Sequence, residues 1–337
     1  MGHIRRLLVA NRGEIARRIM ATSHEMGIET VAVYSEGDAG EPFVAEATLA
    51  RSLPGRRASD TYLNIAALIH LAKETGSDAV HPGYGFLSEN AHFAQAVIEA
   101  GLVFVGPPPA VITALGDKLN AKKAMREADV PVLDSVEIPA VANSSLSFPV
   151  LVKAAAGGGG RGMRVVGAKE ALAEAVGSAQ REAEAAFGDS RVFIEPYLAR
   201  ARHVEVQILG DKAGNLVHCF ERECSIQRRH QKIIEEAPSS ALGDELRAEM
   251  TSAALRAARA VGYENAGTVE FLLGDDGRFF FLEVNTRLQV EHPVTEAITG
   301  VDLVREQILI AEGAPLAFSQ DDLAMKGHAI EARLYAE

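Results

Sequence analysis

The stretch FFFLEVNTRLQVEH, residues 279–292, has a polar side chain at every second position from Glu283 to Glu291, and most positions between them are aliphatic. Successive side chains of an extended chain point to opposite faces, so the pattern predicts a strand with one polar and one apolar face. Two acids, two amides and a guanidinium would share the polar face. An ordinary half-solvated surface strand has the same alternation. The rest of the sequence therefore has to distinguish such a strand from one that lines a functional site.

The composition is that of a globular chain with more than one domain. Its 337 residues exceed the ~100–200 expected for a single domain, which predicts two or three. Hydrophobic residues make up 47% and charged residues 24%, values typical of globular proteins. A formal net charge of −12 disfavours nucleic acid and anionic membranes as partners, because phosphate neutralisation requires an excess of Lys and Arg.

Several features predict a soluble, cytoplasmic protein. No apolar run approaches the ~20 residues that span a bilayer. The start MGHIRRLLVANRG has too short an apolar core for a signal peptide and has no cleavage site. The two cysteines, Cys219 and Cys224, have no second pair with which to form a zinc site, so we expect reduced thiols.

The first hundred residues alternate strand-like and helix-like segments, which predicts a mainly parallel, Rossmann-like sheet. Its first turn, ANRGEIA, contains one glycine where dinucleotide binding needs three, so a dehydrogenase is disfavoured. The segment HPGYGFLSEN, residues 81–90, is expected to be either a tight loop or part of a site, with Ser88 as a helix N-cap.

The rest of the chain divides into further units of a mixed α/β and α+β fold. We expect an N-terminal domain at 1–116, a helical linker at 117–134, a small α+β module at 135–202 and a third domain at 203–337. The sequence ends within an apparent strand, so the third domain is expected to be incomplete.

The small module contains the segment VLVKAAAGGGGRGMRVV, residues 150–166, in which two strand-like runs flank a glycine-rich loop. Ordering glycines costs backbone entropy, and exposed backbone N–H groups can offset that cost by binding phosphate. Lys153 at the entrance of the loop supplies matching positive charge. A flexible linker is the competing interpretation, and the loop lacks the Gly-Lys-Ser/Thr of a Walker motif.

The segment TVEFLLGDDGRFFFLEVN predicts a β-hairpin whose turn is centred between the two aspartates of GDDG. This register places Glu283 opposite Thr268, with Glu270 as its diagonal neighbour on the same face. Asn285 follows on that face. Two carboxylates and an amide oxygen are hard ligands suited to Mg²⁺ or Mn²⁺, so we predict a metal site at Glu270, Glu283 and Asn285.

Charged groups further along the sequence predict an anion site. Arg287 offers a planar fork for a small carboxylate-like anion, and Glu291 offers a possible base. The segment ERECSIQRRHQKIIEEAP is densely basic, and we expect either a solvated loop or part of a phosphate or bicarbonate pocket. The positive cluster in it is Arg228, Arg229, His230 and Lys232.

Seven motifs together resemble the biotin carboxylase family of the ATP-grasp fold. In order they are ANRGEIA, HPGYGFLSEN, GDK, GGGGRGMRVV, RHVEVQ, ERECSIQRRHQK and EVNTRLQVEHPVTE, and they extend over essentially the whole chain. The resemblance implies an N-terminal domain, a lid domain that covers ATP, and a C-terminal domain, with ATP between the last two. It also implies the reaction, which is the carboxylation of biotin with ATP and bicarbonate. This is the first half-reaction of a biotin-dependent carboxylase, such as one that acts on acetyl-CoA or propionyl-CoA.

The resemblance implies a role for particular residues. The implied ATP-binding residues are Lys118, Lys153, Gly158, Gly159, Gly160, Gly162, Met163, Glu195, Tyr197, Leu198, His203, Gln227, His230, Glu270, Leu272 and Glu283. The implied bicarbonate-binding residues are Lys232, Arg287, Gln289, Val290 and Glu291, with Glu291 as the base and Arg333 facing the biotin enolate. Lys232, Arg287, Glu291 and Arg333 are therefore the candidate catalytic residues.

The implied ligands are ATP, Mg²⁺ or Mn²⁺, bicarbonate and biotin held on a carrier. The implied partners are a biotin carboxyl carrier, a carboxyltransferase and, for a complete chain, a second copy in a homodimer. Pro196 departs from the charged residue common in the family, and it removes a backbone N–H beside the expected adenine site. Two alternatives remain: another ATP-grasp ligase of the carbamoyl phosphate or purine type, and a nucleotide-binding module without turnover.

Overall fold

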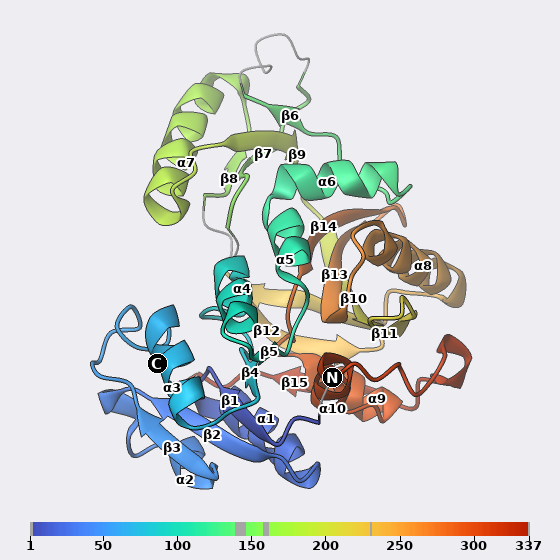
Figure 1. Ribbon diagram of the computed structural model, residues 1–337. Helices are drawn as coiled ribbons and strands as arrows, with labels where there is room; N and C mark the ends of the chain where they lie inside the picture. Colours follow the sequence, from blue (N-terminus) through green and yellow to red (C-terminus); the bar gives the residue numbers. More distant parts are fainter. Residues whose placement is uncertain (1–2, 139–145, 158–161, 230, 336–337) are drawn as a thin grey trace.

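The computed structural model describes residues 3–138, 146–157, 162–229 and 231–335 (Figure 1). Within these ranges the strands form three sheets. The N-terminal sheet is parallel, with strand order β3-β2-β1-β4-β5, and this confirms the predicted Rossmann-like unit. Its strands are β1 (Arg6–Val9), β2 (Glu29–Tyr34), β3 (Leu49–Ser52), β4 (Ala79–His81) and β5 (Val103–Phe104).

Helices accompany this sheet in the expected alternation. They are α1 (Gly13–Glu25), α2 (Pro42–Glu46), α3 (Ile65–Glu74) and α4 (Ala91–Glu99), with a 3-10 turn, η1 (Glu36–Asp38). The N-cap of α4 is Asn90, whose side chain accepts a hydrogen bond from the Phe93 backbone N–H, so the prediction of Ser88 was wrong. Asn caps helices as well as Ser does, and Ser88 lies buried in the preceding loop.

Two helices connect the N-terminal sheet to the small module, as Figure 1 shows. They are α5 (Pro109–Gly116) and α6 (Lys118–Glu127). Asp117 separates them and caps α6 by accepting hydrogen bonds from the backbone N–H groups of Leu119 and Asn120. The cap fixes the first turn of α6, and therefore the position of Lys118.

The small module is a four-stranded sheet of order β6-β9-β7-β8 packed against one long helix. Strands β7 and β8 pair antiparallel on either side of the glycine-rich loop, as predicted. Residues Gly158, Gly159, Gly160 and Arg161 of that loop lie outside the described residues. The elements are β6 (Val136–Glu137), β7 (Val150–Ala154), β8 (Arg164–Val166), η3 (Lys169–Ala171), α7 (Leu172–Phe187) and β9 (Val192–Pro196).

The third sheet is antiparallel, with order β14-β13-β10-β11-β12-β15. Helix α8 covers one face, where Met250, Val206 and Phe271 belong to one apolar core. The elements are β10 (Ala201–Gly210), β11 (Leu216–Arg228), β12 (Gln231–Ala237), α8 (Asp244–Ala260), β13 (Asn265–Gly274), β14 (Phe279–Asn285), α9 (His292–Thr299), α10 (Leu303–Glu312), η4 (Gln320–Asp322) and β15 (Ala329–Ala332).

The hairpin between β13 and β14 forms as predicted, but its register differs. The Gly274 N–H donates to the Arg278 carbonyl over 2.8 Å, which leaves three residues in the loop instead of two. A bulge between Glu270 and Phe271 shifts the register once more, so Glu270 pairs directly with Glu283. The predicted diagonal relation is therefore wrong, and the two acids are closer neighbours than the sequence indicated.

Strand β14 ends at Asn285, so the predicted extended strand through Glu291 was also wrong. Beyond it the backbone leaves the sheet, because the Thr286 N–H donates 3.1 Å to the side chain of Glu89 instead of to a neighbouring strand. Helix α9 then starts at His292. Within the described ranges, no helix has the length and apolarity that crossing a membrane would require.

Candidate active site

A cavity of about 970 Å³ lies between the small module, the third sheet and the loop after β4. It gathers most of the residues that the sequence motifs indicated. Those that line it are Lys118, Lys153, Met163, Glu195, Tyr197, Leu198, His203, Gln227, Lys232, Glu270, Leu272, Glu283, Asn285, Arg287, Gln289, Val290 and Arg333. Tyr84, Gly85 and Glu89 also line it, so the segment at 81–90 forms part of the site and is not only a tight loop.

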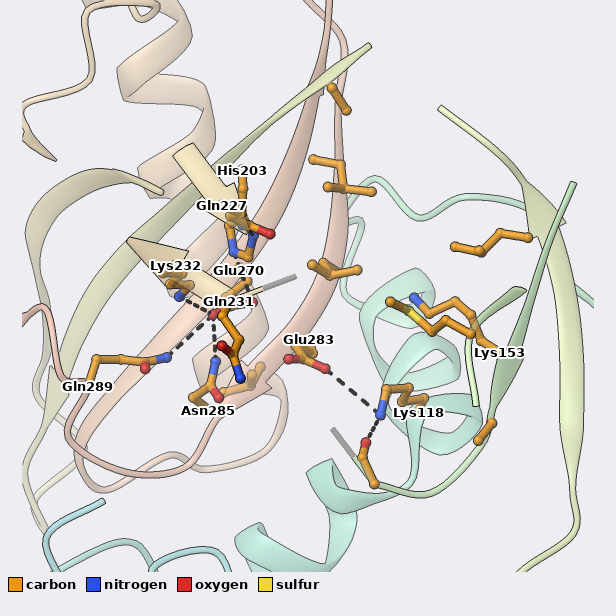
Figure 2. Close-up of a pocket in the computed structure, with 18 of the residues that line it drawn as sticks. Lys118, Lys153, His203, Gln227, Gln231, Lys232, Glu270, Glu283, Asn285 and Gln289 are labelled. Carbon is orange, nitrogen blue, oxygen red and sulfur yellow. Dashed lines mark hydrogen bonds and ion pairs between the residues drawn. The ribbon is translucent and has the colours of Figure 1, made fainter. Parts of the chain in front are cut away.

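Glu270 is the centre of a buried cluster on the sheet side of the cavity (Figure 2). Its carboxylate lies 2.8 Å from Lys232 Nζ and 3.0 Å from His203 Nε2, and it accepts a 2.8 Å hydrogen bond from Asn285 Nδ2. Burial raises the pKa of Glu270, but Lys232 and His203 outweigh that effect and hold it well below its usual range. Glu270 is therefore ionised in this cluster.

Glu283 faces the cavity beside Glu270, and Lys118 Nζ lies 3.9 Å from its carboxylate (Figure 2). Burial and the negative charge of Glu270 together raise the pKa of Glu283. Burial lowers the pKa of Lys118, which also donates to the carbonyl of Gly157 at the start of the glycine-rich loop. The site thus pairs acids on the sheet with a lysine that contacts the loop.

On the side of the small module, two lysines share one buried carboxylate. Lys122 Nζ lies 2.5 Å and Lys153 Nζ 3.0 Å from the two oxygens of Glu195. Burial raises the pKa of Glu195, but the two lysines lower it more. Lys122 was not predicted from the sequence, because its spacing from Lys118 is typical of an ordinary helical surface.

The far end of the cavity is the candidate anion site. Arg287 donates 2.9 Å hydrogen bonds to Glu89 and to Gln289 and a 3.0 Å bond to Asn285 Oδ1. These contacts hold the guanidinium in place. Val290 lines the cavity beside it.

Glu291 lies directly behind this end of the cavity and is fully buried. Its two oxygens contact Lys232 Nζ at 2.6 Å and Arg333 Nη2 at 3.0 Å. Burial raises the pKa of Glu291, but Lys232, Arg222 and Arg333 outweigh burial and lower it to about 2. Glu291 is consequently a carboxylate, able to accept a proton, and it becomes more basic if Lys232 turns to an anion in the cavity.

Some predicted residues do not join the cavity. His230 and three glycines of the loop lie outside the described residues. Gly162 does not line the cavity, and its N–H donates 3.2 Å to Glu182. Arg228 and Arg229 are exposed, as in the simpler interpretation of a solvated loop, whereas Lys232 of the same segment enters the site.

Three further participants in the site were not predicted from the sequence. Glu205 binds Lys232 over 2.5 Å, Arg222 binds Glu205 over 2.6 Å, and Glu89 binds Arg287. Glu205 and Arg222 stand within the motifs RHVEVQ and ERECSIQRRHQK. Glu205 alternates with valines as any strand acid does, and Arg222 stands between two glutamates, a pattern that ordinary surface ion pairs also give. Glu89 lies 198 positions before Arg287, so no local pattern links them.

The donor set beside Lys118 fits a hard divalent cation. Glu270 and Glu283 are paired across β13 and β14, and Asn285 lies next to them, with its amide nitrogen toward Glu270 and its amide oxygen toward Arg287. Burial and, after it, the charge of Glu270 raise the pKa of Glu283, and a cation between the two acids would relieve their repulsion. Carboxylate and amide oxygens are the ligands that Mg²⁺ and Mn²⁺ favour.

Comparison with known families agrees with this geometry. The family model described as "Biotin carboxylase, N-terminal domain" matches residues 3–112. The family model described as "Carbamoyl-phosphate synthase L chain, ATP binding domain" matches residues 117–319. The fold and the site therefore define an ATP-grasp ligase.

Relatives that align over nearly the whole chain specify the family. Biotin carboxylase 2 of Bacillus subtilis is 51% identical over 98% of this chain and 76% of its own length. The alpha chain of the mitochondrial methylcrotonoyl-CoA carboxylase of Dictyostelium discoideum is 50% identical over 99% of this chain, which spans 49% of that larger protein. The chain belongs to the biotin carboxylase family.

Solved structures support the same assignment of the fold. A biotin carboxylase–β,γ-ATP complex from Campylobacter jejuni superposes with a TM-score of 0.95 at 43% identity, covering 98% of this chain and 76% of that one. The biotin carboxylase domain dimer of the Hydrogenobacter thermophilus 2-oxoglutarate carboxylase, in complex with MgADP, ADP and bicarbonate, also gives 0.95 at 45% identity, covering 99% and 75%. The predicted ATP-grasp fold is thus confirmed.

Proposed function

We propose that the protein catalyses the ATP- and bicarbonate-dependent carboxylation of biotin held on a carrier. One observation carries this proposal: a single cavity joins the acids Glu270 and Glu283 and the lysines Lys118 and Lys153 to an anion end formed by Arg287. The acids and lysines suit a nucleoside triphosphate with its metal ion, and the anion end at Arg287 suits bicarbonate. The two reactants would meet between these groups.

The chemistry follows from the charges at the anion end. Glu291 would take the proton of bicarbonate, whose oxygen then attacks the γ-phosphorus of ATP, giving carboxyphosphate and ADP. Carboxyphosphate would break down to CO₂ and phosphate, and that phosphate would remove the N1′ proton of biotin. The resulting enolate, facing Arg333, would capture CO₂. The protein contributes mainly position and charge neutralisation in such a phosphoryl transfer.

Lys118 and Lys153 would hold the phosphates, and the loop that begins at Gly157 would close over them. Closure excludes water, which protects the labile carboxyphosphate. Glu270, Glu283 and Asn285 would hold Mg²⁺, which supplies charge neutralisation at the transferred phosphate. Glu195 and the segment that follows it would contact adenine, with His203 and Gln227 also at the nucleotide.

We further propose the setting in which this reaction occurs. Relatives of this chain include components of biotin-dependent carboxylases, such as a pyruvate carboxylase subunit from Methanothermobacter thermautotrophicus. The proposed partners are therefore a biotin carboxyl carrier, a second copy of the chain and a carboxyltransferase.

The unpaired thiols of Cys219 and Cys224 support a cytoplasmic location. We place the domain boundaries after residues 116, 134 and 202.

A second candidate is a carbamoyl phosphate type of ligase, because the match over residues 117–319 has that description. The two candidates differ in the acceptor. Carboxylation requires biotin, whereas carbamoyl phosphate synthesis requires ammonia and no biotin.

The experiment is an assay of ADP release from ATP with bicarbonate and magnesium, with and without free biotin. Biotin-stimulated release that disappears when bicarbonate is removed is the expected result. Release stimulated by ammonia and indifferent to biotin would favour the second candidate. ATP binding by calorimetry with no ADP release under either condition would contradict both and indicate a binding module.

A further inference from the structure

Arg222, in the middle of β11, is fully buried and does not line the cavity. Its guanidinium donates to Glu205 Oε1 at 2.6 Å, Gln207 Oε1 at 2.8 Å, Thr295 Oγ1 at 2.9 Å and Thr268 Oγ1 at 3.1 Å. A charge without solvent contact is expensive unless it is paired and hydrogen-bonded. Four side chains from two neighbouring strands and one helix meet that need here.

Glu205 connects Arg222 to the anion end of the site. One of its oxygens accepts from Arg222, and the other accepts from Lys232 Nζ at 2.5 Å. Lys232 in turn lies 2.6 Å from Glu291. Arg222, Glu205, Lys232 and Glu291 thus form a row of alternating charges. Because Arg222 and Lys232 bind different oxygens, Arg222 determines how the Glu205 carboxylate is oriented toward Lys232.

The crowding of acids explains why this support is needed. Glu205 pairs with Glu270 across β10 and β13, and single ligand atoms of Glu205 and Glu291 lie within 4.8 Å of each other. Lys232 contacts all three of these carboxylates. Without a second cation behind Glu205, its buried charge would be matched only by a lysine that also binds two other acids.

We propose that Arg222 is a positioning residue for bicarbonate. Acting through Glu205, it holds Lys232 at the place where that ammonium receives the anion beside Glu291. This inference rests on the proposed function, and it adds a residue that touches neither nucleotide nor bicarbonate.

The alternative is a purely structural role, in which Arg222 only joins strands β10, β11 and β13 to helix α9. A structural role predicts that its loss weakens every property of the protein together. A positioning role predicts a selective loss of bicarbonate binding. The two roles therefore differ in the ratio between the effects on bicarbonate and on ATP.

The test compares Arg222→Gln and Arg222→Lys with the wild type by KM for bicarbonate, KM for ATP and kcat of ADP release. We expect Arg222→Gln to raise KM for bicarbonate at least about tenfold, with KM for ATP changed less than about twofold. Arg222→Lys, which keeps the charge but loses the fork, should recover part of the loss. An equal rise in both KM values, or no rise in either, would overturn the proposal.

Arg247→Gln is the matched control for general destabilisation. Arg247 is also mostly buried, with 14% side-chain exposure, and its guanidinium binds Glu221 on the same strand β11 at 2.9 Å. Its other hydrogen bonds go to Asp244 and the Leu242 carbonyl, away from the charge row. This variant should therefore lower the melting temperature without changing the ratio of the two KM values.

If Arg222→Gln does not fold, a milder variant keeps the proposal testable. Thr295→Val removes one acceptor of Arg222 and should give a smaller shift in the same direction.

A double variant tests the route through Glu205. If Arg222 acts by way of that carboxylate, Arg222→Gln should add little to the bicarbonate defect of Glu205→Gln; additive effects would contradict that route.

Calorimetric titration of bicarbonate in the presence of a non-hydrolysable ATP analogue gives a readout without turnover. A wild type that binds bicarbonate but releases no ADP would contradict the proposed function. The comparison of Arg222 variants by binding would still decide this inference.

Discussion

Glu270 and Glu283 lie directly opposite one another on the paired strands β13 and β14, at the edge of the cavity that also contains Lys118. Like charges in this arrangement repel, and they contribute to the raised pKa of Glu283, with burial as the larger cause. A cation between them would convert this repulsion into binding. We therefore propose that this pair is the part of the site most dependent on magnesium.

The first prediction concerns that dependence. Replacing Glu283 by Gln should raise the Mg²⁺ concentration needed for half-maximal ADP release at least about tenfold, because one charged oxygen ligand is lost. Titration of Mn²⁺ followed by electron paramagnetic resonance measures the metal directly. Glu249→Gln, on the exposed side of α8, is the control. Superimposable metal titrations for both variants would exclude the pair as ligands.

The second prediction concerns the base. Glu291→Gln should lower biotin-stimulated ADP release by about 10²–10³, the usual effect of removing one oriented charged group at such a site. Binding of a non-hydrolysable ATP analogue should remain within about twofold of the wild type, since Glu291 lies at the anion end. Turnover equal to that of the wild type would show that another group takes the proton.

The third prediction concerns the turn that sets the register of the two acids. Gly277 has φ of +78° with nothing within 4 Å of an added Cβ, so Gly277→Ala tests backbone strain alone. We expect a loss of about 1–2 kcal/mol in the free energy of unfolding, measured by urea titration. Gly40 also has open space but no positive φ, so Gly40→Ala should cost nothing. Equal stabilities of the two variants would refute the strain argument.

The fourth prediction concerns pH. Burial raises the pKa of Glu331 from 4.5 to about 7, helped by the charges of Glu235 and Glu291. The folded protein therefore retains a proton that the unfolded chain releases near 4.5, so Glu331 contributes stability at low pH that is lost as the pH rises through about 7. Glu331→Gln keeps the neutral form at every pH, and it should gain stability relative to the wild type over this interval.

Urea unfolding between about pH 5 and about pH 8 measures that gain. The control Glu249→Gln should follow the wild-type curve at a constant difference. Parallel curves for Glu331→Gln and the wild type would mean that Glu331 titrates normally.

Much of the site could be predicted because it is carried by local patterns. The alternation from Glu283 to Asn285 survives in β14, and the strands flanking the glycine-rich loop form as expected. The register could not be predicted, because a three-residue turn and a bulge each shift it by one position. Neither changes the periodicity of hydrophobic residues enough to be read from the sequence.

The amino-acid sequence by itself determined the layered α/β and α+β units, the motifs of the family and the residue types that we propose to serve phosphate, metal and bicarbonate. These follow from periodicity and spacing within a few residues, where the geometry of the backbone decides. Only the tertiary structure decided which charged side chains form ion pairs with one another. Glu205 reaches Lys232 and Glu89 reaches Arg287 because separate strands and loops pack together, and the burial of Glu205 then makes its cationic partner necessary.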